Sequence, residues 1–263
     1  MKRLNRPLVT QETIKAMEDM SFFTHAMIFD DLLIIAQRET SCFVLWTTDG
    51  LIIIDAIWPA RPAFDAIVNA ISDAGWGGCP VKKLLLTHGH VDHTGCGRWL
   101  AERYRLKTYL SETDDVFWQE HPAKPDRPET WKDYRIDCYI KDKDTIPLGD
   151  KTIYVCGTPG HTPGCLSYLF PVTENGQTHM AALWGGATPP RTREGVVQYL
   201  ESLDYFMEAA KERNAEVALS NHTSIDNGLE RIEYAATRLS YMPTINIHGT
   251  DGFRHNYQVF RAM

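Results

Sequence analysis

Apolar residues along this chain fall into short runs that alternate with helix-like segments. The runs Cys42–Trp46 and Leu51–Asp55 lie on either side of Thr47–Gly50, which predicts a hairpin with its turn at the Asp-Gly pair. The second run is apolar at four consecutive positions, so we expect a strand buried on both faces. From Pro62 to Ala74, apolar residues recur at the spacing of one helix face. Alternation of this kind is typical of an α/β fold.

The same alternation continues to the end of the chain. The remaining strands are expected at Val81–Thr87, Lys107–Leu110, Lys151–Cys156, Leu166–Phe170, Met180–Trp184 and Val217–Ser220. The remaining helices are expected after Gly97 to about Arg105, over Val196–Arg213 and over Gly228–Leu239. Ser111, with Asp114 three residues later, has the pattern of a helix N-cap, and Thr173–Gly176 has that of a hairpin turn. No linker composition interrupts this order, so we expect one domain over residues 1–263, built of two sheet-plus-helix halves.

Two segments differ in character from the rest. Residues 119–137 are charged and rich in proline, which predicts a long loop. Such a loop is either a lid over an active site or a surface insertion, and the sequence favours neither. Residues 241–263 form a C-terminal tail with aromatic side chains, which could cover its own domain or a neighbouring subunit.

Charge and composition argue against some classes of function. The 263 residues carry a formal net charge of −7 with no basic block, which argues against a nucleic-acid partner. No apolar run approaches the roughly 18 residues of a membrane span. Met1–Pro7 resembles the start of a signal peptide, but the apolar core that should follow is missing. We therefore expect a cytoplasmic protein, or a periplasmic one if a leader has been removed. The six cysteines form no C-x-x-C pair and predict free thiols.

Three histidines and an aspartate lie within the six residues that follow the strand predicted at Val81–Thr87. They are His88, His90, Asp92 and His93. Neutral imidazole is the commonest metal ligand in proteins, and a carboxylate adds a hard oxygen donor. Burying these groups without partners would cost several kcal/mol, so packing alone explains the cluster poorly. Gly89 allows the backbone to turn tightly there. The cluster predicts a metal site.

Two further histidines occupy similar positions. His161 lies on a Gly- and Pro-rich turn after one strand, and His222 follows the last predicted strand. Histidines on stiff turns at strand ends are what a preorganised metal centre requires. The other five are interpreted as ordinary core or surface residues: His25, His121, His179, His248 and His255.

The pattern His88-x-His90-x-Asp92-His93 resembles the signature of the metallo-β-lactamase superfamily. The apolar strand that ends at Asp55 and the turn Thr158–Cys165 are also similar to motifs of that family, and the resemblance covers about residues 25–240. It implies a four-layer αβ/βα sandwich, in which two mixed sheets pack face to face with helices outside and metals at one sheet edge.

One departure from the family pattern reduces the number of subfamilies that the chain resembles. Many members carry a bridging Asp after the strand that follows the third motif, but Leu183–Thr188 holds neither a carboxylate nor a thiolate. This disfavours a resemblance to glyoxalase II, to lactonases, to flavodiiron proteins and to the lactamase subclass with Cys there. The remaining match is the third subclass of metallo-β-lactamases. By that resemblance two zinc ions bind the chain, one held by His88, His90 and His161, and the other by Asp92, His93 and His222.

The resemblance implies a zinc-dependent hydrolase. Zinc lowers the pKa of bound water from about 15.7 toward 7, so a hydroxide can attack the carbonyl of a cyclic amide such as a β-lactam. Asp92 would both bind metal and orient the hydroxide or pass on its proton. The alternative is a metabolic lactone, ester, thioester or amide hydrolase with little lactamase activity. Thr188 and Arg191 are candidates for binding a substrate carboxylate, although either could be an ordinary surface residue.

Two other interpretations compete with a zinc hydrolase. A redox enzyme on the same fold would hold iron, but the missing bridging Asp counts against it. A binding protein with a degenerate site would have lost ligands, whereas this chain retains the full set. We therefore expect an enzyme with a small-molecule substrate, and the oligomeric state stays open.

Overall fold

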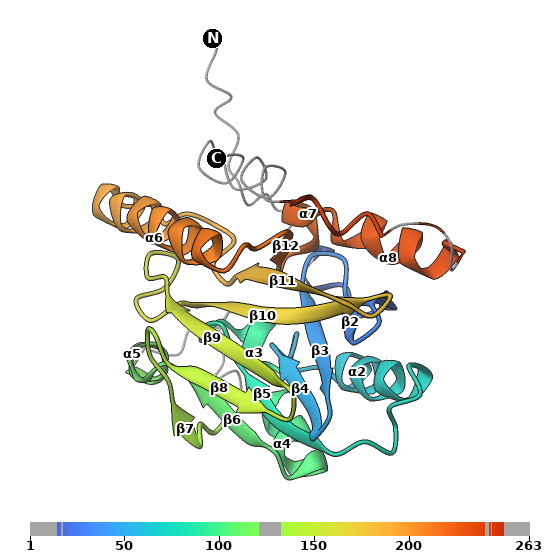
Figure 1. Cartoon of the computed structure of the whole chain (residues 1–263). Helices are drawn as coiled ribbons and strands as arrows, with labels where there is room; N and C mark the ends of the chain where they lie inside the picture. Colours follow the sequence, from blue (N-terminus) through green and yellow to red (C-terminus); the bar gives the residue numbers. More distant parts are fainter. Residues whose placement is uncertain (1–14, 17, 121–132, 240–241, 243, 250–263) are drawn as a thin grey trace.

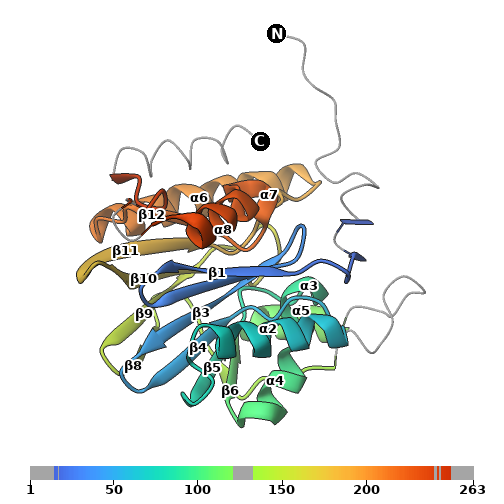
Figure 2. The same ribbon diagram turned by 90° about the vertical axis from the view of Figure 1, so that its right-hand side faces the viewer.

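The computed structural model describes residues 15–16, 18–120, 133–239, 242 and 244–249. These residues form two mixed β-sheets that lie face to face, with helices on both outer faces (Figure 1, Figure 2). Across the larger sheet the strands follow the order β1 (Thr24–Phe29), β2 (Leu32–Ala36), β3 (Ser41–Thr47), β4 (Gly50–Ile54), β5 (Val81–Leu85), β6 (Lys107–Leu110) and β7 (Cys138–Tyr139). Across the smaller sheet the order is β12 (Val217–Ser220), β11 (Gln177–Trp184), β10 (Leu166–Glu174), β9 (Lys151–Gly157) and β8 (Thr145–Leu148). The predicted αβ/βα sandwich is confirmed.

The helices form the two outer layers. Those beside the larger sheet are α2 (Arg61–Asp73), α3 (Val91–Thr94), α4 (Gly97–Tyr104) and α5 (Glu112–Glu120) (Figure 2). On the side of the smaller sheet lie α6 (Arg193–Glu212) and α7 (Thr223–Asp226), and α8 (Gly228–Thr237), in the same outer layer, packs against β1 and β2 of the larger sheet. None of the helices in the described part of the chain combines the length and the apolar composition that a membrane span requires.

Three apolar layers hold the sandwich together. The central layer joins both sheets, with Phe43 and Ile54 from one and Tyr168 from the other. A second layer packs α2 against the larger sheet, and a third packs Phe206 of α6 against Trp184 of β11. Each of these side chains is almost fully buried, and burying one large apolar side chain contributes about 1.5–3 kcal/mol.

Both predicted hairpins are present. In the first, Thr47 pairs with Gly50, so the turn residues are Thr48 and Asp49 and not the Asp-Gly pair. Gly50 has a φ of +128°, and a Cβ there would lie 2.3 Å from the carbonyl oxygen of Pro80. Only glycine fits this close approach of two backbones. In the second hairpin, Asn175 and Gly176 both have positive φ, as a two-residue Asn-Gly turn requires.

Other predictions need correction or lie outside the described residues. Strands β1, β2, β7 and β8 were not predicted. Residues 119 and 120 belong to α5 and not to a loop, and residues 121–132 are outside the described residues, so the lid stays a prediction. Of the tail 241–263, only residues 242 and 244–249 are described.

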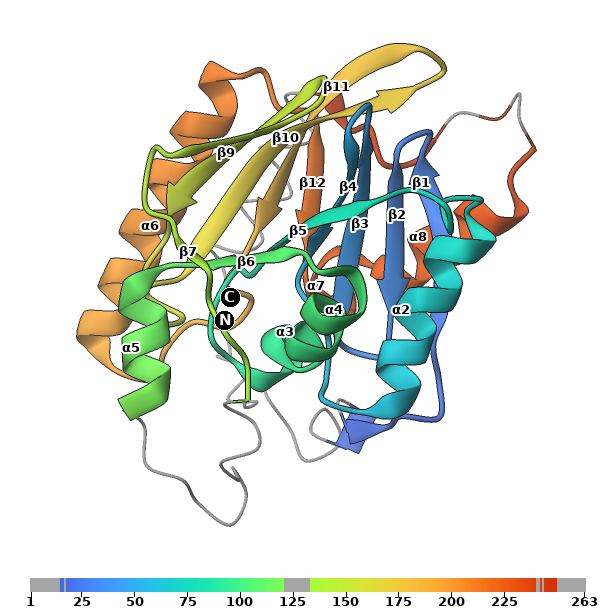
Figure 3. The ribbon, with the colours of Figure 1, turned by 90° about the horizontal axis from the view of Figure 1, so that it is seen from below.

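The connections that follow several strands meet at one edge of the sandwich (Figure 3). The parallel strands β4 and β5 lead to Asp55 and Thr87, and the parallel strands β11 and β12 lead to Gly185 and Asn221. Because parallel strands end on the same side of a sheet, their loops converge there. The loop between β9 and β10, which carries His161, reaches the same edge.

Candidate metal centre

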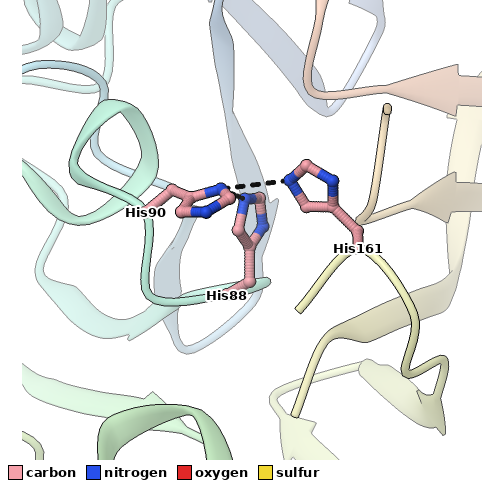
Figure 4. Close-up of side chains that lie close together, drawn as sticks. All are labelled: His88, His90 and His161. Atoms are coloured by element: carbon pink, nitrogen blue, oxygen red, sulfur yellow. Dashed lines mark hydrogen bonds between the residues drawn. The ribbon is translucent and has the colours of Figure 1, made fainter. Parts of the chain in front are cut away.

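Three histidines from two loops point their ring nitrogens at one another; we call them the first triad. His88 and His90 follow β5, and His161 lies between β9 and β10 (Figure 4). The Nδ1 atom of His90 lies 3.1 Å from Nε2 of His88 and 3.1 Å from Nε2 of His161. Three nitrogens from these two loops therefore converge on a single point.

Asp92, His93 and His222 form a second triad beside the first. The Nε2 atoms of His93 and His222 are 3.2 Å apart, and Oδ2 of Asp92 lies 3.4 Å and 3.7 Å from them. Val91–Thr94 is one turn of helix, α3. This turn directs Asp92 and His93 toward His222, and the ring of His93 also lies 4.2 Å from the ring of His88 in the first triad.

The spacing of the donor atoms tests whether metal ions fit. Zinc bound tetrahedrally at about 2.0–2.1 Å has ligand atoms about 3.3 Å apart. The separations of 3.1–3.7 Å within both triads agree with that value. In each triad the three potential ligand atoms all lie within 4.8 Å of one another. The donors, imidazole nitrogen and one carboxylate, are also those that zinc prefers.

One buried carboxylate, Asp55, connects the two triads. Its Oδ2 atom accepts a hydrogen bond from Nδ1 of His93 at 2.9 Å. It also accepts from the hydroxyl of Thr87 at 2.9 Å, and that hydroxyl lies 3.0 Å from Nδ1 of His88. A hydroxyl that donates to a carboxylate accepts from its other neighbours. Asp55 therefore places a proton on Nδ1 of His93 directly, and Thr87 places one on Nδ1 of His88. In both rings Nε2 then faces the metal site.

Asn221 completes this buried network. Its Nδ2 atom lies 3.0 Å from Oδ2 of Asp55, from the hydroxyl of Thr87 and from the carbonyl of Gly185. Three acceptors surround this atom, so it is the nitrogen of the amide. Asn221 precedes His222 in the chain and thereby ties the second triad to the ends of β4, β5 and β11.

His161 is oriented differently. Its Nδ1 atom donates to the backbone carbonyl of Thr188 at 2.6 Å, which again leaves Nε2 for a metal. The chain reaches Thr188 through Gly185 and Gly186, where a side chain has no space. A Cβ at Gly186 would lie 2.7 Å from Cβ of His161, and one at Gly185 would lie 1.9 Å from the carbonyl oxygen of Leu166. Packing thus excludes a bridging carboxylate at this turn.

Burial lowers the pKa of the first-triad residues His88 and His161, and the neighbouring histidines lower it further. In His161 the Thr188 carbonyl opposes this shift only in part. Burial and His93 also lower the pKa of His222, to about 4. These three rings are therefore neutral at pH 7, as metal ligands must be.

In the second triad, Asp92 and His93 each favour the charged form of the other. Burial would raise the pKa of Asp92, but His93 and His222 outweigh it and hold the pKa well below its usual range. Burial would lower the pKa of His93, but Asp92 and Asp55 raise it to about 10. Without a metal ion, His93 is thus an imidazolium between two carboxylates.

The structure brings all six predicted ligands together. Thr188 lies next to the first triad, where its backbone carbonyl has a clear role, and Arg191 is exposed on the same connection. The orienting roles of Thr87 and Asn221 were not predicted from the sequence. Asp114 was predicted only as part of a helix cap, although its carboxylate contacts both loops of the first triad.

Comparisons with known proteins agree with this geometry. A family model described as the metallo-beta-lactamase superfamily matches residues 36–174. The chain is 32% identical over 140 residues to the uncharacterized protein YobT of Bacillus subtilis, an alignment that covers 51% of this chain and 58% of YobT. It is 31% identical over 108 residues to a hydroxyacylglutathione hydrolase of Mesorhizobium japonicum, which covers 41% of this chain and 35% of that protein. The matched region therefore spans little more than half of one relative and about a third of the other.

Solved structures show the same fold over most of the chain. The subclass B3 metallo-beta-lactamase BJP-1 of Bradyrhizobium japonicum superposes with a TM-score of 0.73 at 21% identity, and the alignment covers 91% of each chain. The metallo-beta-lactamase FEZ-1 of Legionella gormanii also gives 0.73, at 16% identity, over 91% of this chain and 94% of that one. At these identities the likeness establishes the fold alone.

Proposed function

This chain belongs to the metallo-beta-lactamase superfamily, and from that membership we propose that it is a hydrolase that uses two divalent metal ions, preferably zinc. One observation carries the proposal: six donor atoms converge in two triads at one sheet edge, at separations that suit tetrahedral zinc. Buried polar groups fix the rings of His88, His93 and His161 with Nε2 toward the centre. Such outer partners are typical of built metal sites.

In this proposal His88, His90 and His161 hold one ion, and Asp92, His93 and His222 hold the other. Bound zinc ions would lower the pKa of water toward 7 and polarise a substrate carbonyl. Asp92 stays ionised at neutral pH, because His93 and His222 hold its pKa low. Its carboxylate can therefore bind a cation and hold or orient a proton at the reacting centre. Asp55 and Thr87 fix the rings from behind and are themselves almost completely buried.

We infer a cyclic amide of the β-lactam kind as the substrate. The supporting observation is the Gly185–Gly186 turn, where close packing leaves no space for a bridging carboxylate, so the two ions would have separate ligand triads. The structural relatives with this fold include subclass B3 metallo-beta-lactamases. Arg191 and the side chain of Thr188, next to the first triad, would bind a substrate carboxylate.

A second candidate is thioester or ester hydrolysis. Several sequence relatives are hydroxyacylglutathione hydrolases, at 28–33% identity over 34–41% of this chain. A metal centre of this kind suits either reaction, because both begin with attack on a carbonyl carbon.

One experiment separates these proposals. The purified chain is loaded with zinc, its metal content is counted by mass spectrometry, and a panel of β-lactams, lactones and thioesters is assayed. Two zinc ions per chain with lactam turnover support the leading proposal. Two zinc ions with turnover of thioesters or lactones alone support the second candidate.

The control for this experiment is another histidine. His179 pairs with Glu216 at 2.7 Å and belongs to neither triad, so His179→Ala should keep both ions, whereas His161→Ala should lose one. A chain that binds no metal at any zinc concentration would remove the basis of both proposals.

A further inference from the structure

Helix α5 begins between the two loops that form the first triad. Its N-cap, Ser111, accepts a hydrogen bond from the backbone N–H of Asp114 at 3.1 Å, which confirms the cap predicted from the sequence. Both side chains are buried, and Asp114 is completely inaccessible to solvent. A carboxylate is rarely buried to this extent unless hydrogen bonds compensate for its lost hydration.

The carboxylate of Asp114 makes those bonds to both ligand loops. Its Oδ2 atom accepts from the backbone N–H of Gly89 at 2.5 Å, and Oδ1 accepts from that of Gly164 at 2.9 Å. Gly89 lies between His88 and His90, and Gly164 lies three residues after His161. One side chain thus joins the two backbone segments from which all three first-triad ligands project.

Close packing reinforces this connection. The hydroxyl of Ser111 donates to the carbonyl of Gly164 at 2.6 Å. A Cβ at Gly164 would lie 2.3 Å from that hydroxyl, and one at Gly89 would lie 3.1 Å from Cβ of Trp118. The ring of Trp118, one helical turn beyond Asp114, lies 5.0 Å from the ring of His90. The face of α5 that carries these residues therefore fits directly against the backbone of both loops.

The second triad is held by different groups. Asp55 orients His93, and backbone pairing with Thr40 fixes the segment of His222. We propose that Asp114 is a positioning residue that sets the affinity of the first triad for its metal ion and leaves the second triad almost unaffected. This inference rests on the proposed metal centre.

The test measures metal affinity one triad at a time. His222→Ala breaks the second triad and leaves the first, and His161→Ala does the reverse. Into each background Asp114→Asn is introduced, which keeps the size of the side chain but turns an N–H₂ group toward a backbone N–H. Co²⁺ is titrated against each protein and followed by visible absorption. In the His222→Ala background we expect Asp114→Asn to weaken binding about 10–100-fold. In the His161→Ala background we expect less than a twofold change.

Asp115→Asn is the matched control, because this neighbouring carboxylate accepts from the hydroxyl of Tyr139. It should change neither affinity. Ser111→Ala provides a milder second variant if Asp114→Asn does not fold, and it should weaken the first triad about fivefold. A merely structural role would lower the melting temperature without distinguishing the triads, so equal losses in both backgrounds, or none, would overturn the inference. Absence of Co²⁺ binding to the unmutated chain would instead overturn the metal centre, and this inference with it.

Discussion

The two triads use similar ligands but are oriented by different kinds of group. In the first triad, neutral oxygens hold the rings: the Thr87 hydroxyl at His88 and the Thr188 carbonyl at His161. In the second triad, a carboxylate holds the ring, because His93 donates to Asp55. A neutral acceptor selects the tautomer of a histidine, whereas a carboxylate also stabilises its protonated form.

Because of this difference, the two triads differ in charge and protonation before a metal ion binds. In the first triad, His88 and His161 are neutral imidazoles, which can accept a cation without losing a proton. The second contributes the negative charge of Asp92 but retains a proton on His93 until a cation displaces it. Asp55 contacts His93 of the second triad directly and His88 of the first triad through Thr87. Asp114, in contrast, contacts only the backbone of the loops that carry the first triad. Variants at these residues should therefore separate the two triads.

Asp92→Asn should have the largest effect. It removes the only anionic ligand of the second triad and the group proposed to hold a proton during the reaction. We expect kcat to fall about 10²–10⁴-fold and the metal content to fall from two ions to one. Steady-state kinetics and mass spectrometry measure both quantities. Asp65→Asn, at a partly exposed aspartate paired with Arg61, should change neither. If the Asp92→Asn variant keeps two metal ions and its turnover, Asp92 is neither a metal ligand nor a catalytic group.

Asp55→Asn should weaken both triads, in contrast to Asp114→Asn. Asn tolerates the φ of +62° at this position, so the backbone can persist while the charge is lost. We expect the second triad to lose about 10–100-fold in metal affinity and the first triad less, since Thr87 intervenes there. Removing one partner of a buried ion pair should also lower the unfolding free energy of the metal-free chain by about 3–5 kcal/mol, measured with urea. Selective loss at one triad would contradict the bridging role of Asp55.

The pH dependence of metal binding should also differ. Because the pKa of metal-free His93 is raised to about 10, a cation entering the second triad between pH 7 and 9 must release about one proton. The second-triad affinity should therefore rise about tenfold per pH unit in this window. The pKa values of His88 and His161 are lowered, so the first-triad affinity should stay nearly constant there.

Isothermal titration calorimetry in buffers of different ionisation enthalpy counts the protons. The His161→Ala and His222→Ala backgrounds report one triad each. Equal proton release from both would show that the carboxylates around His93 do not control its charge.

Local patterns predicted most of the fold, and the missed elements show where such patterns are ambiguous. Leu51–Ile54 was recognised as a buried strand because four consecutive apolar residues predict one. Leu32–Ala36 carries the same signal on five positions and could have been found in the same way. Strand β8 was harder to predict, because Pro147 interrupts it. It lies at the edge of its sheet, where the missing N–H is tolerated.

The ligands were predictable for a local reason, since four of the six lie within residues 88–93. The groups that orient them were not. Asp114 meets Gly89 across 25 positions, and Asn221 meets Thr87 across 134. These contacts depend on the order of the strands in the two sheets, and no spacing in the sequence predicts that order. The sequence pattern at Ser111 and Asp114 indicated a helix cap, while the second role of the carboxylate needed the three-dimensional structure.

Arg191→Ala should have the smallest effect and should act on substrate binding alone. Arg191 is exposed on the connection whose Thr188 carbonyl holds His161, and we propose that its guanidinium binds a substrate carboxylate. For a substrate with a carboxylate we expect KM to rise about two- to fivefold, the contribution of one exposed ion pair, while kcat stays constant. Arg193→Ala, at the exposed start of α6, is the matched control. A KM that does not change for any active substrate would leave Arg191 as an ordinary surface residue. Substrate recognition would then have to come from elsewhere around the first triad, with Thr188 as the next residue to substitute.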